Sequence, residues 1–170
     1  GTARPVAVEP FLRGCAWPSG QGAMYPRADP RDFARLPVDT WGTAGIPVGV
    51  RLEFTGAARA VQIAYRTRNA DLGHRGDAAG TTFAAYQGEV LLDEVDAVHG
   101  DGMAILDLEK ADEEATISVY LPEGMKPEIV PVVVSGNVTL DVDSCADGPG
   151  HGPSRSSLPR NGVVSTGPCV

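Results

Sequence analysis

Apolar residues recur at every second position in short runs between Val48 and Val142, and glycine or proline separates most of these runs. In the first run, valine, leucine and phenylalanine alternate with glycine, arginine and glutamate, as in a strand that buries one face. Such runs recur at intervals of roughly 8–14 residues, which is typical of a sandwich. They cover residues 48–54, 61–65, 81–87, 89–95, 103–108, 115–121, 129–134 and 138–142. The pattern predicts an all-β fold, a two-sheet antiparallel sandwich or jelly roll of about eight strands.

Composition agrees with this prediction and excludes two classes of partner. The chain has 21 glycines and 14 prolines among 170 residues, a density at which long helices rarely form. It carries 22 acidic and 14 basic side chains, a net charge of −8 that suits neither a phosphate backbone nor an anionic lipid surface. No apolar run reaches the roughly 18 residues that a membrane-spanning helix needs. We therefore expect neither a nucleic-acid partner nor a membrane partner.

The two ends of the chain lack the alternating pattern. Residues 1–47 carry prolines at short intervals, which excludes helix interiors and central strands. Trp17, Phe33 and Trp41 lie among these prolines and are expected to hold the segment on the sandwich. Residues 144–170 are rich in glycine, proline and serine and have few aliphatic side chains to bury. We divide the chain into a proline-rich arm (1–47), a β-sandwich (48–143) and an irregular tail (144–170).

The three cysteines leave the redox compartment open. Cys15, Cys145 and Cys169 form no CxxC pair and allow either three reduced thiols or one disulfide with a free thiol. A Cys145–Cys169 bridge would close the tail, and a Cys15–Cys145 bridge would join the arm to the last strand. Either bridge would indicate an extracellular protein, and three thiols a cytoplasmic one.

The glycine-rich segment between residues 69 and 80 holds the candidate ligand-binding residues. Asp71, His74, Arg75 and Asp77 place two carboxylates, an imidazole and a guanidinium within seven positions. Loops held by a rigid sandwich often carry binding groups, so these four side chains could bind a small polar ligand. The alternatives are a solvated loop whose charges pair with one another, or a contact with a second domain.

Other polar and aromatic residues give weaker signals. His99 is expected on a surface turn, and His151 in the tail has no serine nucleophile to serve. The histidines lack zinc spacing and the acidic residues lack EF-hand spacing, so we expect no metal and no cofactor. The tryptophans and tyrosines could form a sugar-binding platform or, as we prefer, pack the arm.

Three motifs resemble a known family. They are Ile46–Phe54 (IPVGVRLEF), Val61–Thr67 (VQIAYRT) and Val119–Pro127 (VYLPEGMKP), the last leading into residues 129–136. They resemble the N-terminal β-sandwich of actinobacterial SGNH/GDSL-type esterases and acyltransferases, a domain likened to carbohydrate-binding modules. The resemblance covers about residues 30–142 and implies a flavodoxin-like hydrolase domain as the natural neighbour.

The nucleophile of that family is missing. Neither Gly-Asp-Ser nor GxSxG occurs, and the two Gly-Asp pairs continue as Gly76-Asp77-Ala78 and Gly100-Asp101-Gly102. No catalytic residue is therefore assigned, and whether the chain is an enzyme stays open. The resemblance favours a non-catalytic module that binds a glycan or acyl-bearing small molecule, or docks on a hydrolase domain. The alternative is a small esterase, acyltransferase or cyclase with acid/base chemistry at Asp71, His74 and Asp77.

Overall fold

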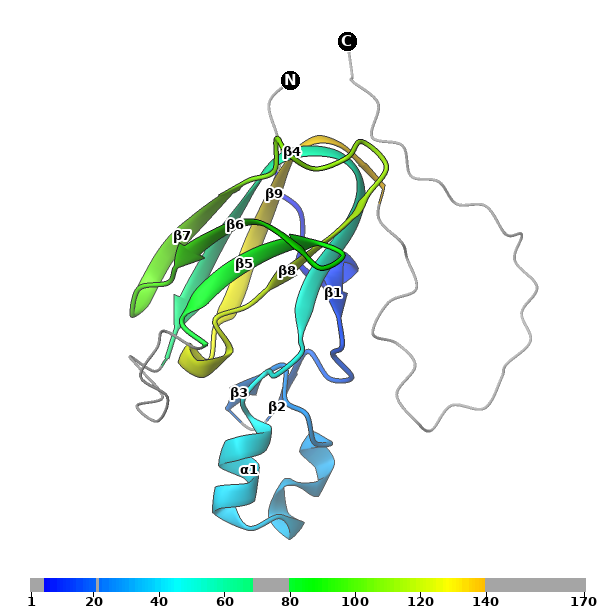
Figure 1. Cartoon of the computed structure of the whole chain (residues 1–170). Helices are drawn as coiled ribbons and strands as arrows, with labels where there is room; N and C mark the ends of the chain where they lie inside the picture. The colour runs from blue at the N-terminus through cyan, green and yellow to red at the C-terminus, as the bar shows by residue number, and fades with distance from the viewer. Residues whose placement is uncertain (1–4, 21, 69–79, 140–170) are drawn as a thin grey trace, which may run out of the picture.

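The computed structural model describes residues 5–20, 22–68 and 80–139, and strands dominate this part of the chain (Figure 1). Seven strands form one antiparallel sheet, and two more form a separate small hairpin. The predicted all-β, antiparallel sandwich class is confirmed. The strands are β1 (Leu12–Arg13), β2 (Ser19–Gly20), β3 (Ala23–Met24), β4 (Arg51–Thr67), β5 (Thr82–Gln87), β6 (Val90–Asp96), β7 (Gly100–Asp107), β8 (Thr116–Tyr120) and β9 (Glu128–Thr139).

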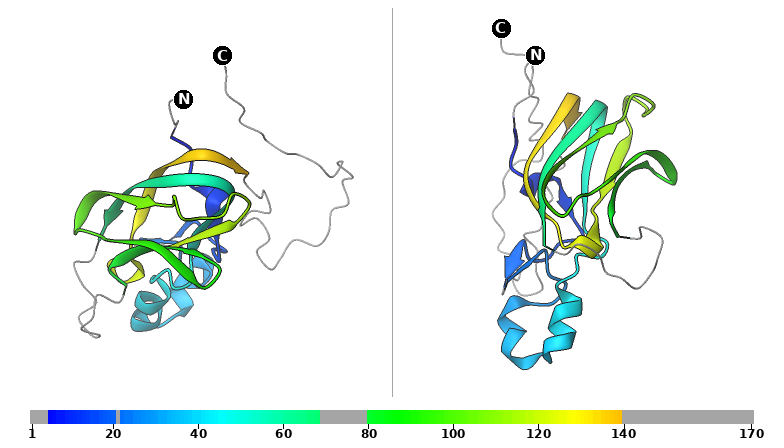
Figure 2. Two further views of the ribbon diagram at one scale, coloured as in Figure 1. Left: turned by 45° about the horizontal axis from the view of Figure 1, so that its top comes forward. Right: turned by 90° about the vertical axis from the view of Figure 1, so that its left-hand side faces the viewer.

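Strand β4, 17 residues long, organises the sandwich. Its first part pairs with β1 on one side and with β8 on the other. Its last part pairs with β7, and β9 follows it along most of its length. Beyond β8 the sheet continues through β5 to β6. The two layers seen in Figure 2 are thus parts of one hydrogen-bonded sheet, because β4 runs from one layer into the other.

The expected breaks between residues 54 and 61 and between residues 134 and 138 are absent, which joins the expected strands on either side of each break. Gly56 lies inside β4 with φ 128, and Gly136 lies inside β9 with φ 125. The two strands pair side by side here, Ala58 with Gly136, and their register shifts between Ala58 and Ala60. A β-bulge of this kind bends a strand without ending it. Each pair of expected strands is therefore one long bent strand.

The core follows the predicted two-residue alternation. On β7, Ala104 and Leu106 are fully buried, whereas Met103 and Ile105 face outward. The side chains with no exposed surface come from both layers and pack in one cluster. They include Leu52, Val61, Ile63, Phe83, Leu106, Leu108, Ile117 and Val119.

The N-terminal region has more regular structure than its prolines suggest. It contains the short helices η1 (Glu9–Phe11), η2 (Pro30–Arg35) and α1 (Val38–Ala44) besides strands β1 to β3. Helix α1 fits between two prolines, with Pro37 as its N-cap, a position at which the missing amide costs nothing. None of the helices in the described part of the chain is both long and apolar enough to span a lipid bilayer.

Helices η2 and α1 form a helical lobe, residues 26–47, that projects beyond one end of the sandwich (Figure 1). Trp41 is its buried centre, and the ring of Phe33 meets it edge-on with centroids 5.3 Å apart. Phe33, expected as an anchor, remains 40% exposed, and Trp17 is half-buried. The N-terminal region joins the core cluster instead through Val8, Phe11, Leu12, Cys15 and Tyr25.

Candidate functional site

The four site residues predicted from the sequence, Asp71, His74, Arg75 and Asp77, lie outside the described residues. The residues that flank their segment are described. The backbone amide of Arg68 donates to the Met125 carbonyl (3.0 Å), and the amide of Gly124 donates to the Gly80 carbonyl (2.9 Å). Both ends of the segment are therefore tied to the short helix η3 (Glu123–Met125).

Helix η3 is itself held firmly in place. The amide of Gly49 donates to the Glu123 carboxylate (3.3 Å), which links η3 to the start of β4. A side chain at Gly80 would lie 2.9 Å from the Gly124 nitrogen, so the two backbones can approach only because this position is glycine. Lys126 is the C-cap of η3, and its backbone is left-handed with φ 50°.

A cleft of about 220 Å³ lies beside Lys126, where the helical lobe meets the sandwich. We call it the junction cleft. Four segments distant in sequence line it: the β2–β3 hairpin, helix α1 with the residue after it, the residue after β4, and the residue after η3. The lining residues are Gly22, Ala23, Met24, Trp41, Gly42, Gly45, Arg68 and Lys126.

Arg68 connects two walls of the junction cleft. One guanidinium nitrogen, Nη1, donates to the Gly22 carbonyl of the β2–β3 hairpin (2.7 Å). The other, Nη2, lies 3.4 Å from a carboxylate oxygen of Glu128. Of the described side chains that line the cleft, the charged ones are Arg68 and Lys126, and both are cations. The cleft therefore suits an anion better than a cation.

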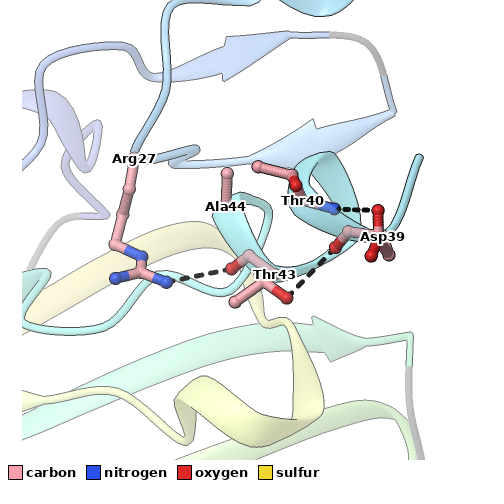
Figure 3. Close-up of a pocket in the computed structure, with 5 residues that line it drawn as sticks. All are labelled: Arg27, Asp39, Thr40, Thr43 and Ala44. Atoms are coloured by element: carbon pink, nitrogen blue, oxygen red, sulfur yellow. Dashed lines mark hydrogen bonds between the residues drawn. The ribbon is translucent and has the colours of Figure 1, made fainter. Parts of the chain in front are cut away.

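A second, larger cleft of about 480 Å³ lies on the helical lobe (Figure 3). Its polar groups are already engaged with α1. Arg27 donates through Nε to the Ile46 carbonyl and through Nη2 to the Thr43 carbonyl, both at 3.0 Å. Thr43 donates in turn to the Asp39 carbonyl (3.1 Å), and the Asp39 carboxylate accepts from the Thr40 amide (2.9 Å). These residues cap and brace the helix, so we assign the cleft no ligand.

The remaining candidates are dispersed. His99 is exposed in the turn between β6 and β7. Among the described residues no three His, Cys, Asp or Glu side chains are arranged to hold a metal ion. The Asp93 carboxylate on β6 accepts from the Asp107 amide on β7 (2.7 Å), so this acidic residue links two strands. Cys15 is buried and its thiol donates to the Trp17 carbonyl (3.1 Å); the two cysteines of the expected tail bridge lie outside the described residues.

The aromatic residues considered as an alternative sugar-binding platform do not share a single surface. Tyr25 is buried in the core and Trp41 in the helical lobe. Tyr86 and Tyr120 meet edge-on, with centroids 5.7 Å apart, on the neighbouring strands β5 and β8. The sequence pattern could not show which of these aromatic rings are buried and which are exposed, because burial depends on which segment covers each ring.

Comparison with solved structures identifies the fold. The chain resembles a GDSL-like lipase from Bacteroides ovatus ATCC 8483, with a TM-score of 0.61 and 16% identity over 79% of this chain and 42% of the lipase. It also resembles the salicylyl-acyltransferase SsfX3 from a tetracycline biosynthetic pathway, with a TM-score of 0.62 and 20% identity over 83% of this chain and 42% of that protein. The sequence matches no protein-family model and no curated protein.

These matches correct the family resemblance inferred from the sequence. Neither structure is described as a carbohydrate-binding module, and the lipase comes from Bacteroides ovatus. The assignment to a carbohydrate-binding-like jelly roll of actinobacterial esterases is wrong. The motifs behind it follow β-strand patterning, which many unrelated sandwiches share. What stands is a fold related to part of a GDSL-like lipase and part of an acyltransferase, and the chain spans less than half the length of either.

Proposed function

We propose that this chain is a non-catalytic β-sandwich domain that works together with a catalytic domain of the hydrolase or acyltransferase class. The observation that carries the proposal is the coverage of the two structural matches. About four-fifths of this chain, 79% and 83%, corresponds to only 42% of each matched protein. More than half of each of those proteins thus lies outside the shared β-domain, and this remainder has room for a catalytic domain.

The chemistry of the described residues supports a non-catalytic role. Acyl transfer needs a nucleophile beside a base, together with donors for the oxyanion. The described histidine, His99, is exposed in the turn between β6 and β7, and the described cysteine, Cys15, donates its thiol to the Trp17 carbonyl. The sequence also lacks the Gly-Asp-Ser and GxSxG motifs.

An exposed apolar surface supports contact with a second domain. Met103 and Ile105 on β7 and Val130 on β9 are 60%, 54% and 61% exposed. The two strands flank the same part of β4, so these side chains lie on one outer sheet face. Contiguous apolar patches on a soluble domain often mark a protein contact.

The test is turnover by the purified chain. With p-nitrophenyl acetate and p-nitrophenyl butyrate we expect hydrolysis no faster than in buffer. The His74→Ala variant is the matched control, because His74 is the candidate base of the competing enzyme hypothesis. Hydrolysis above background that disappears in His74→Ala would overturn the non-catalytic assignment.

A further inference from the structure

We propose that the junction cleft binds a small organic carboxylate, with the carboxylate beside Lys126 and Arg68 and the apolar part against Trp41 and Met24. This inference is independent of the non-catalytic role proposed above. It would hold whether or not a catalytic domain is attached, and its test involves no turnover.

The charge of the cleft points to an anion. The Arg68 amide donates to the Met125 carbonyl, so Arg68 and Lys126 start from neighbouring backbone positions. Glu128 neutralises one of these two cations through its 3.4 Å contact with Arg68. Lys126 is half-buried, and within residues 5–20, 22–68 and 80–139 no hydrogen-bond or ion-pair partner for its ammonium is present. The described lining therefore keeps one uncompensated positive charge in a protein whose net charge is −8.

The other walls of the cleft point to an apolar body on that anion. Trp41, Met24 and Ala23 line it together with glycine backbone. A side chain added at Gly22 or at Gly42 would meet no atom within 4 Å, so both positions leave open space. A volume of about 220 Å³ is below the roughly 300–1,000 Å³ that drug-sized ligands occupy, so the ligand is small. A carboxylate with one short chain or one ring has this size and chemistry.

The fixed geometry of the cleft favours binding. Arg68 fastens the β2–β3 hairpin to the end of β4 through the Gly22 carbonyl (2.7 Å), so this wall is in place before a ligand arrives. Gly45 at the end of α1 packs tightly on Ala23, because a side chain at Gly45 would lie 3.3 Å from the Ala23 Cβ. Such pre-organisation lowers the ordering cost of binding.

The test uses benzoate as the probe, with isothermal titration and tryptophan fluorescence as readouts. The chain has two tryptophans, so the Trp17→Phe variant leaves Trp41, a wall of the cleft, as the single reporter. We expect saturable binding of benzoate with a Kd of about 1 mM, as suits a ligand of so few atoms. Benzyl alcohol, which lacks the charge, and acetate, which lacks the ring, should each bind at least about tenfold more weakly.

Two pairs of variants locate the site. Lys126→Asn removes the ammonium while keeping a residue that tolerates the left-handed backbone, and should weaken benzoate binding about tenfold. The matched control, Lys110→Asn, removes an exposed lysine away from the cleft and should leave the Kd unchanged. Gly42→Leu fills the open space on α1 and should abolish binding, whereas Gly42→Ala should retain it. A thermal melt of each variant checks that the fold is intact.

Three results would overturn the proposal. The first is no saturable benzoate signal by either method. The second is an equal Kd in the unmodified chain and in a folded Lys126→Asn variant. The third is binding of inorganic phosphate or benzyl alcohol as tight as that of benzoate, since either would show that charge and apolar wall do not act together. If Gly42→Leu fails to fold, the Lys126→Asn result decides.

Discussion

The two halves of the N-terminal region are alike in composition and differ in what they bury. Residues 5–25 and the helical lobe, residues 26–47, are both rich in proline and contain only short elements. The first half places Phe11, Leu12 and Tyr25 in the core of the sandwich. The second half has Trp41 as its one large buried side chain, while Phe33 remains 40% exposed and η2 buries nothing.

This difference shows that the density of prolines in a segment does not predict how much of that segment is buried in the core of the sandwich. The first half should unfold only with the whole domain, because its side chains fill the common core. The helical lobe buries less and can open locally at a lower free-energy cost. The lobe also provides the Trp41 wall of the junction cleft.

Replacing one phenylalanine in each half should give the largest difference in the free energy of unfolding between the two halves. Phe11 is 1% exposed and its ring meets Phe54 edge-on at 6.2 Å, so Phe11→Ala should lower the free energy of unfolding by about 3–5 kcal/mol. Phe33→Ala, at a half-exposed position in the lobe, should cost less than about 1 kcal/mol. Urea denaturation measures both changes. Equal losses would show that the lobe is as integral to the domain as residues 5–25.

Tyr25 tests how residues 5–25 are held on the sandwich, because its hydroxyl contacts strand β9. The hydroxyl oxygen accepts from the Ile129 amide (3.2 Å) at a buried position. Tyr25→Phe leaves that amide without a partner and should lower the free energy of unfolding by about 1–3 kcal/mol. Denaturation at neutral pH measures this loss, and an unchanged stability would contradict the assigned contact.

The same residue gives a pH dependence of known sign. Burial raises the pKa of Tyr25 from 10.0 to about 12. The unfolded chain therefore loses this proton at a lower pH than the folded chain. The stabilisation is fully present below pH 10 and is lost as the pH rises towards 12, by about 2–3 kcal/mol. In Tyr25→Phe this part of the alkaline loss should be absent. If the free energy of unfolding falls equally with pH above 10 in the unmodified chain and in Tyr25→Phe, the prediction is wrong.

The most local expected effect is at the end of α1 in the helical lobe. Arg27 holds the end of α1 through the carbonyls of Thr43 and Ile46. Because Arg27 is exposed, Arg27→Ala should cost only about 1 kcal/mol, and only locally. Amide exchange in α1 should accelerate while the global melting temperature stays nearly constant. Arg27→Lys keeps the charge but cannot donate to both carbonyls at once. Its rate of amide exchange in α1 should therefore lie between those of the unmodified chain and Arg27→Ala. Accelerated exchange throughout the sandwich would show that lobe and sandwich unfold together.

Local sequence pattern was sufficient for the fold class and for the buried face of strands such as β7. Alternation such as Met103-Ala104-Ile105-Leu106 assigns each side chain to a face without reference to other strands, because side chains in a strand alternate with period two. The breaks were less predictable. Gly56 looks like a turn in sequence, and it becomes a bend inside β4 because β9, bending at Gly136, stays paired with it.

For the candidate site, even less could be predicted from the local sequence. Loop chemistry directed attention to Asp71 and His74, which lie outside the described residues. The junction cleft brings together Gly22, Trp41 and Lys126, from three segments with no shared motif. Nothing in their local sequence indicates a cleft, because a lone lysine or a glycine after a short strand is ordinary surface. Only the packing of the lobe against the end of the sandwich places two cations beside an indole ring, and that contact depends on the tertiary structure.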